Sequence, residues 1–167
     1  AYHLPLSSAG IDKISTPNIM LGKSPARDKE IEMIQQMISV AGKTGVRALN
    51  YNTIILEILR TGRTIDPTSP DGFEGIKKFA QLYDSPSHGF NLCLGSTAEG
   101  LKDPRTEILP IIRWVGERKQ IFNIHLRNIK GGWNNFQEVY PDNGDMNFGE
   151  IIRELRNVGY DGMVMPD

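Results

Sequence analysis

The stretch FNLCLGSTAEGLKDPRTEILPIIRWVGERKQIFNIH, residues 90–125, decides the fold class. Its two ends, residues 90–93 and 121–125, are short apolar runs typical of buried strands. Between them, residues 104–117 carry apolar side chains at helical spacing, preceded by an acidic N-cap. Pro110 predicts a kink in this helix or a later start. The stretch therefore predicts a strand–helix–strand unit, the connection that parallel strands require.

The same alternation continues on both sides of this unit. Further strands are expected at residues 46–50 and 162–165, and further helices at 24–41, 53–60, 73–83 and 148–157. Three segments lack such periodicity: a mostly irregular arm at 1–23, a possible gap or mobile segment at 61–72, and a long polar loop at 127–145. We therefore predict an α/β fold of parallel β/α units, in a single domain over residues 1–167.

Composition narrows the class of protein. The 167 residues include 19 Lys and Arg against 20 Asp and Glu, so the net charge is −1 and nucleic acid is not expected as a partner. With 39% apolar and 23% charged residues, the chain does not resemble a disordered one. It contains no apolar run of the roughly 18–20 residues that cross a bilayer, and its first ten residues do not resemble a signal peptide. We expect a cytoplasmic protein without a membrane partner.

Three potential metal ligands occupy the ends of three consecutive predicted strands. Cys93 ends the first, His125 the second and Asp167 the third. Because parallel strands point the same way, their carboxyl ends gather at one edge of the sheet, where α/β folds place their sites. A thiolate, an imidazole and a carboxylate together suit a divalent transition metal. The alternative is that the cysteine is a small buried hydrophobe and the histidine a hydrogen-bonded structural residue.

Two further residues adjoin predicted strand ends. Arg127 follows His125 by two positions, where a guanidinium could bind a substrate carboxylate in a bidentate manner or form an ordinary loop salt bridge. Tyr51 follows the predicted strand at 46–50, and it could line the same edge or belong to a helix cap.

Several segments resemble the mannonate dehydratase family. They are NIMLGKSPARDKEIE, ALNYN with the following ILRTGRT, DSPSHGFNLCLGS, IFNIHLRNIKGG, NFQEVYPDNGDM and GYDGMVMPD, which together span most of residues 4–167. The resemblance implies part of a (β/α)8 TIM barrel, related in shape to xylose-isomerase-like sugar isomerases. At 167 residues the chain is shorter than the ~200–250 of a complete barrel. The resemblance also implies dehydration of D-mannonate to 2-keto-3-deoxy-D-gluconate, with Mn²⁺ or Fe²⁺ as cofactor.

Carried over by motif, the family's metal ligands would be Cys93, His125 and Asp167. Arg127 would contact the substrate, and Tyr51 would be a candidate for proton transfer. The family has a further metal-binding histidine in a segment resembling HPxDP, for which the corresponding residues 61–72 hold no histidine.

Two other functions remain open from the sequence. One is a metal-dependent sugar isomerase or epimerase on the same barrel, and the other is an inactive remnant that binds a sugar acid. In each case the expected partner is a small sugar acid, and a homo-oligomer is possible.

Overall fold

The computed structural model describes residues 2–6, 13–52, 72–133 and 135–166. Its contacts divide the chain into two compact units, Ala1–Arg60 and Thr61–Asp167, which we describe separately. The prediction of one domain over residues 1–167 stays a prediction. Among the described residues, no helix combines the length and apolar character needed to span a bilayer.

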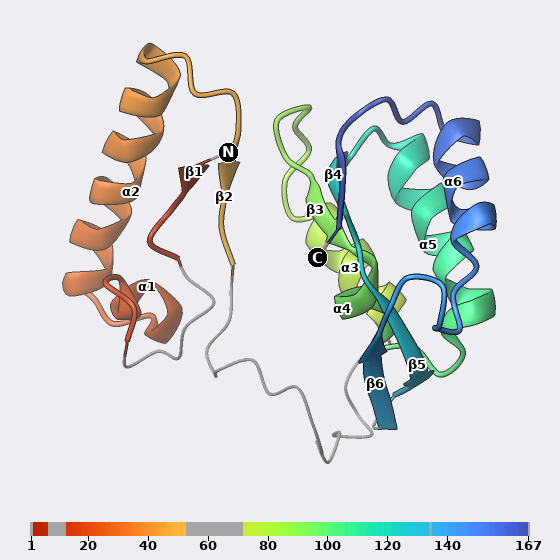
Figure 1. Cartoon of the computed structure of the whole chain (residues 1–167). Coiled ribbons are helices and arrows are strands. Elements are labelled where there is room, and N and C mark those ends of the chain that lie inside the picture. The colour runs from red at the N-terminus through yellow and green to blue at the C-terminus, as the bar shows by residue number, and fades with distance from the viewer. Residues whose placement is uncertain (1, 7–12, 53–71, 134, 167) are drawn as a thin grey trace. The chain divides into compact units, whose positions relative to one another are not determined.

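In the described residues of the N-terminal unit, two helices accompany a two-stranded parallel sheet (Figure 1). Strand β1 (Tyr2–His3) pairs with β2 (Leu49–Asn50), and helix α1 (Pro17–Leu21) packs against α2 (Ala26–Lys43). The predicted helix at 24–41 and strand at 46–50 are confirmed in shorter or shifted form. Residues 1–23, predicted as a mostly irregular arm, carry both β1 and α1. The helix predicted at 53–60 lies outside the described residues.

The C-terminal unit is built on a parallel sheet in the order β3–β4–β7. Its strands are β3 (Phe90–Cys93), β4 (Ile121–Leu126) and β7 (Val164–Pro166). Between β3 and β4 the chain forms α4 (Leu94–Ala98) and α5 (Pro104–Glu117), and α6 (Phe148–Asn157) precedes β7. Helix α3 (Gly72–Ala80) comes before β3. These elements confirm the predicted parallel β/α units, while the short helix α4 was not predicted.

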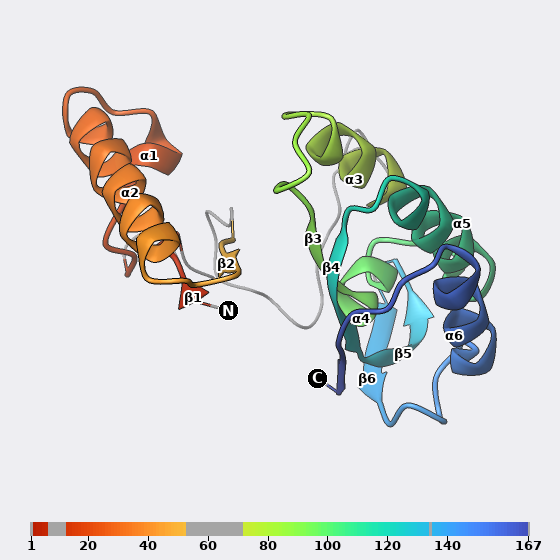
Figure 2. The same ribbon diagram turned by 90° about the horizontal axis from the view of Figure 1, so that it is seen from above.

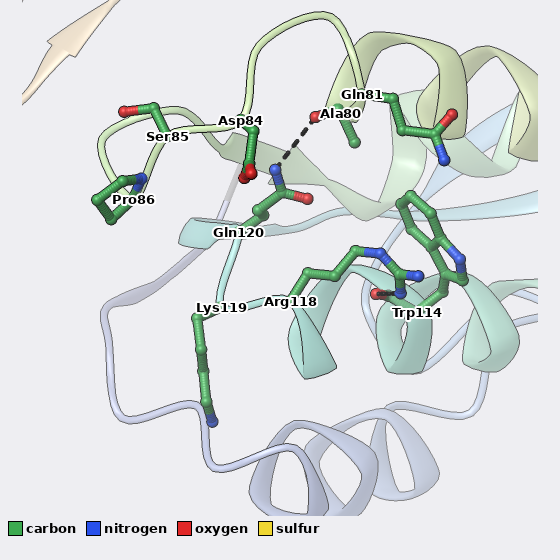
Figure 3. A pocket seen from close by; sticks show the side chains of 9 residues that line it. All are labelled: Ala80, Gln81, Asp84, Ser85, Pro86, Trp114, Arg118, Lys119 and Gln120. Atoms are coloured by element: carbon green, nitrogen blue, oxygen red, sulfur yellow. Dashed lines mark hydrogen bonds between the residues drawn. The ribbon is translucent and has the colours of Figure 1, made fainter.

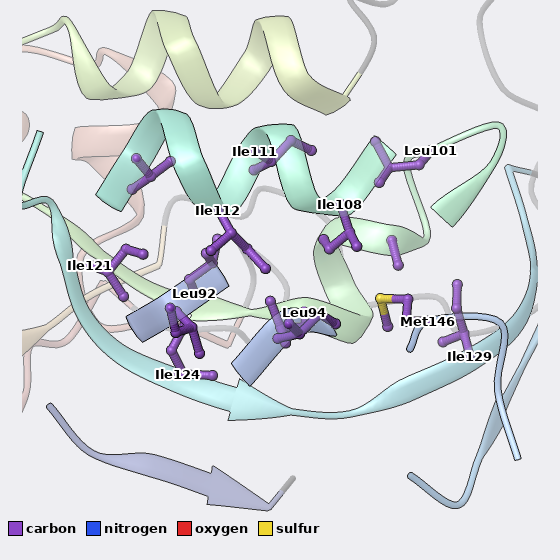
Figure 4. Packing of buried hydrophobic residues seen from close by; sticks show 14 residues of the cluster. Leu92, Leu94, Leu101, Ile108, Ile111, Ile112, Ile121, Ile124, Ile129 and Met146 are labelled. Atoms are coloured by element: carbon purple, nitrogen blue, oxygen red, sulfur yellow. The ribbon is translucent and has the colours of Figure 1, made fainter. Parts of the chain in front are cut away.

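The core of this unit lies between the sheet and the helices α5 and α6, which cover one face of it (Figures 1 and 2). Ile108, Ile111 and Ile112 of α5 are fully buried, and they pack with Leu92 of β3 and Ile124 of β4 (Figure 4). Helix α5 begins at its proline N1 position, and the carboxylate of its N-cap residue accepts a hydrogen bond from the helix backbone. It continues through Pro110, so the later start suggested by that proline is wrong.

The predicted polar loop at 127–145 is wrong over most of residues 128–139. Residues Asn128–Gly132 form β5, which pairs in antiparallel fashion with β6 at Asn135–Val139. This hairpin carries little of the apolar alternation that marks a half-buried strand. Contacts distant in sequence stabilise it instead: the Gly131 amide donates to the Asp145 carboxylate at 2.7 Å, and the Trp133 amide donates to the Leu101 carbonyl at 2.7 Å.

Candidate active site

Cys93 and His125 are neighbours across the parallel sheet. They form a register pair between β3 and β4, and His125 is in turn paired with Met165 of β7. Residues paired in a parallel ladder project to the same face, and adjacent strands are about 4.8 Å apart. The residues directly before them in each strand, Leu92 and Ile124, are buried on the opposite face of the sheet. The thiol and the imidazole therefore lie side by side at the carboxyl ends of their strands, on the face that α5 and α6 leave open.

The third predicted ligand, Asp167, lies outside the described residues. Strand β7 ends at Pro166, directly before it in the sequence. Within the described part of the chain, no group of three His, Cys, Asp or Glu side chains is placed to hold a metal ion. The structure thus brings together two of the three predicted ligands, and the role of Asp167 stays a prediction.

Cys93 is anchored to helix α4 as well as to its strand. The Cys93 Sγ atom accepts a hydrogen bond from the Ser96 amide at 3.5 Å, and it is the N-cap of α4. The Cys93 carbonyl accepts a hydrogen bond from the Thr97 hydroxyl at 2.8 Å. Leu94 and Ala98, on the other side of this short helix, are completely buried. These contacts fix the position of the thiol at the strand end.

Arg127 lies just beyond β4, with 9% of its side chain exposed, and contacts two glutamates that are more accessible to solvent. Its Nη2 atom donates to the Ser96 hydroxyl at 2.8 Å and to the Glu99 carboxylate at 2.5 Å. Its Nη1 atom donates to the Glu138 carboxylate, on β6, at 2.7 Å. The side chain also packs so closely on Gly95 that a Cβ atom there would collide with it. This geometry is that of a salt bridge, one of the two sequence interpretations, and substrate contact stays a prediction.

Asn128, the residue after Arg127, organises the loop that follows β6. Its Nδ2 atom donates to the carbonyls of Pro141 and Met146 at 2.7 and 3.0 Å. Its Oδ1 atom accepts from the amides of Ile129 and Met146 at 3.0 and 3.2 Å. The side chain is 1% exposed, so these four bonds satisfy a buried amide.

Sequence reasoning missed Asn128 and the two glutamates that hold Arg127. Their partners are 11 to 28 residues away in the chain, and spacing of residue types carries no signal for such pairs. The only local signal is the position of Asn128 next to Arg127 and His125 in the sequence HLRN.

Tyr51 belongs to the N-terminal unit, where it follows β2. Partial burial raises the pKa of its phenol above the ordinary value. Its part in catalysis stays a prediction.

A pocket at the opposite end of the sheet contains none of the predicted site residues (Figure 3). It is formed by segments that precede β3 and β4. The Arg118 guanidinium lies 3.7 Å from the centre of the Trp114 ring, and the Gln120 amide donates to the Ala80 carbonyl at 3.2 Å. Active sites of β/α folds lie at the carboxyl ends of the strands, so the edge with Cys93 and His125 is the better candidate.

Comparison with known proteins gives a family likeness for the C-terminal unit. A family model described as D-mannonate dehydratase (UxuA) matches residues 71–167, which is more than half of the chain. Curated proteins named mannonate dehydratase from Streptococcus agalactiae serotype Ia and Streptococcus uberis are 37% and 35% identical over 99 residues. Each match covers 58% of this chain and 28% of the relative, so the chain spans less than a third of their length.

Solved structures show the same fold. The mannonate dehydratase from Streptococcus suis serotype 2 aligns over 91% of this chain and 43% of its own, with a TM-score of 0.56 and 23% identity. A xylose isomerase domain protein from Planctomyces limnophilus aligns over 86% of this chain and 46% of its own, with a TM-score of 0.52 and 16% identity. The predicted fold class, parallel β/α units that form part of a (β/α)8 barrel, is thereby confirmed.

Proposed function

Because the chain belongs to the D-mannonate dehydratase family, we propose that the protein catalyses the metal-dependent dehydration of D-mannonate to 2-keto-3-deoxy-D-gluconate. The observation that carries this proposal is the register pair of Cys93 and His125 at the carboxyl ends of β3 and β4. The family likeness alone indicates the reaction, and this pair indicates where in the chain the reaction takes place.

The two side chains fit a divalent transition metal. A thiolate and an imidazole both bind iron and zinc, whereas calcium sites are built from oxygen ligands. Cys93 and His125 project from adjacent strands to one face, so both can reach a single ion, with Asp167 proposed as a third ligand. When bound, the ion supplies Lewis-acid stabilisation of the charge that develops beside the substrate carboxylate.

The remaining steps require proton transfer and recognition of a carboxylate. Loss of water from a sugar acid needs a base for the proton on C2 and an acid for the departing hydroxyl on C3. Tyr51, the candidate for proton transfer from the sequence, belongs to the N-terminal unit and stays a prediction. We propose Arg127 as the group that neutralises the substrate carboxylate, since Arg127 follows the proposed ligand His125 by two positions in the sequence.

The direct test is an assay of the full protein with D-mannonate, combined with elemental analysis of bound metal. We expect a 2-keto-3-deoxy acid as product, about one manganese or iron per chain, loss of activity with a chelator and recovery with Mn²⁺ or Fe²⁺. An isomeric sugar acid as product would indicate an isomerase instead. Absence of both turnover and metal would leave only a sugar-acid-binding remnant.

The variant Cys93→Ser tests the proposed ligand directly. We expect metal affinity to fall by at least about tenfold, because an alcohol is a poorer ligand than a thiolate. Stability should change little, because Cys93 lies on the open face. The matched control is Asn91→Ser, two residues earlier on the same face, which should retain the metal. Equal metal content in both variants would remove Cys93 from the site.

A further inference from the structure

The pocket at the amino-terminal ends of β3 and β4 lies wholly within the C-terminal unit, and its volume of about 550 Å³ is typical of small-molecule sites (Figure 3). Its lining includes the Asp84 carboxylate and the Arg118 guanidinium. Within the described residues these two charges form no ion pair, either with each other or with a third side chain. A third charged residue, Lys119, is engaged elsewhere, because its ammonium group donates to the Val158 carbonyl at 2.8 Å. The pocket therefore offers one negative and one positive group to a ligand.

Arg118 is exposed but held in place by Trp114. Its guanidinium lies 3.7 Å from the centre of the indole ring, and its Nη1 atom donates to the Trp114 carbonyl at 2.8 Å. In the described part of the chain, the Nε and Nη2 atoms of Arg118 donate to no acceptor. A guanidinium with N–H groups to spare suits a carboxylate.

Gln120 adds a hydrogen-bond acceptor to the same pocket. Its Nε2 atom donates to the Ala80 carbonyl at 3.2 Å, which fixes the orientation of the amide. Its Oε1 atom is buried and accepts no hydrogen bond from the described residues. A buried acceptor without a donor is destabilising, so a donor group that reaches it is favoured. Figure 3 shows Gln120 between the side chains of Asp84 and Arg118.

We propose that this pocket binds a zwitterionic amino acid, with the carboxylate on Arg118 and the ammonium group on Asp84 and the Gln120 Oε1 atom. Asp84 disfavours a ligand that is only an anion, and Arg118 disfavours one that is only a cation. A ligand with both charges is complementary to the pair.

The rest of the lining favours an apolar side chain on this amino acid. Ala80, Pro86 and Trp114 contribute apolar surface beside the charged groups. The pocket is separate from the strand ends with Cys93 and His125, so the inference does not depend on the proposed function.

The test is calorimetric titration of the full protein with L-leucine, L-leucinamide and 4-methylpentanoate. L-Leucinamide lacks the carboxylate, and 4-methylpentanoate lacks the ammonium group. The variants are Arg118→Gln and Asp84→Asn, which remove one charge each. Arg156→Gln and Glu117→Gln are the matched controls, because both residues are exposed and lie outside the pocket lining.

We expect the wild type to bind L-leucine at least about fivefold more tightly than either analogue. Arg118→Gln should weaken L-leucine binding about two- to fivefold without changing the Kd of L-leucinamide. Asp84→Asn should weaken L-leucine binding to a similar extent without weakening that of 4-methylpentanoate. Both controls should match the wild type. Absence of L-leucine binding, equal binding of all three compounds, or equal losses in the controls would overturn the inference.

Thermal unfolding of each variant shows whether weaker binding reflects loss of folded protein. Arg118→Lys provides a second variant, since it keeps the charge and loses only the planar guanidinium. Its affinity for L-leucine should lie between those of the wild type and Arg118→Gln. An affinity below that of Arg118→Gln would contradict the proposed contact with the carboxylate.

Discussion

The two faces of the β3–β4–β7 sheet have different compositions. On one face, Leu92 and Ile124 are 3% and 0% exposed beneath the helices. On the other face, Cys93, His125 and Asn123 are only partly buried, and the Asn123 amide donates to Asn91 at 2.9 Å. Along the same strands, alternate residues thus form the apolar core on one face and a polar surface on the other.

This difference teaches that stability and chemistry can be changed separately in this unit. Apolar side chains packed under α5 and α6 contribute the burial that holds the strands in place. Polar side chains on the open face contribute less apolar burial, so their replacement should change stability less. Adjacent residues of β4 can test this separation, because Ile124 and His125 project to opposite faces.

The largest effect on stability should come from Ile124→Ala. Truncation of a completely buried isoleucine removes apolar burial and leaves a cavity, at a cost of about 3 kcal/mol in the free energy of unfolding. Chemical denaturation of the full protein measures this loss, with Ile124→Val as a matched variant expected to lose about 1 kcal/mol. A loss well below that of the valine variant would contradict the assignment of the core face.

His125→Ala should have the opposite profile. We expect activity on D-mannonate to fall at least about a hundredfold, since even residues that only support a metal ligand contribute roughly 10–100-fold. The free energy of unfolding of the metal-free protein should remain close to that of the wild type. Steady-state kinetics and denaturation on the same samples check both statements, and a loss of stability without a loss of activity would reverse the roles of the two faces.

Arg127→Lys should have a smaller effect, mainly on substrate affinity. A lysine keeps the charge, but its single ammonium group cannot replace the planar guanidinium that donates to Ser96, Glu99 and Glu138. We expect KM for D-mannonate to rise on the order of tenfold, with a smaller change in kcat. If KM is unchanged in kinetic assays, Arg127 serves only as a bridge between α4 and β6.

The smallest effect, on the unfolding temperature, should come from the Glu154 carboxylate of helix α6. The Arg113 guanidinium donates to the Glu154 carboxylate at 2.6 Å and lowers the pKa of that carboxyl group, against the opposing effect of burial. A lowered pKa in the folded state stabilises the protein above the ordinary carboxyl pKa of about 4.3. This stabilisation is lost as the pH falls through the lower, folded-state value. Glu154→Gln should therefore reduce the unfolding temperature slightly near neutral pH, and the difference from wild type should disappear in acid.

Much of the C-terminal fold follows from local sequence signals. Helix α5 has an aspartate N-cap and a proline at its first position, and the side chain of Asn147 caps α6 by accepting two backbone hydrogen bonds. Both helices also have apolar side chains at helical spacing. Such signals act within a few residues, so they can be recognised without the structure. The β5–β6 hairpin could not be predicted, because Asn128, Arg127 and Asp145 stabilise it through contacts made elsewhere in the chain.

The site was predictable to the extent that it depends on strand ends. Cys93 and His125 each end an apolar run, and a parallel arrangement of those runs is sufficient to bring them together. The surroundings of Arg127 were not predictable, because Glu99 and Glu138 come from two elements that had not been predicted. Ion pairs between residues so far apart in the chain depend on the tertiary structure, and they cannot be recognised from local patterns in a single sequence.

The buried amide of Asn128 has a consequence for the evolution of the loop it organises. All four of its bonds go to main-chain atoms, at Ile129, Pro141 and Met146. Because these hydrogen bonds involve only backbone atoms of the loop, they do not depend on most of its side chains. Exposed positions such as 142 and 143 can therefore vary without altering the path of the chain. Gly144 is the exception, because any Cβ atom there would overlap the Asn128 side chain. The loop thus combines constrained positions, such as Gly144 and Asp145, with exposed ones that can vary.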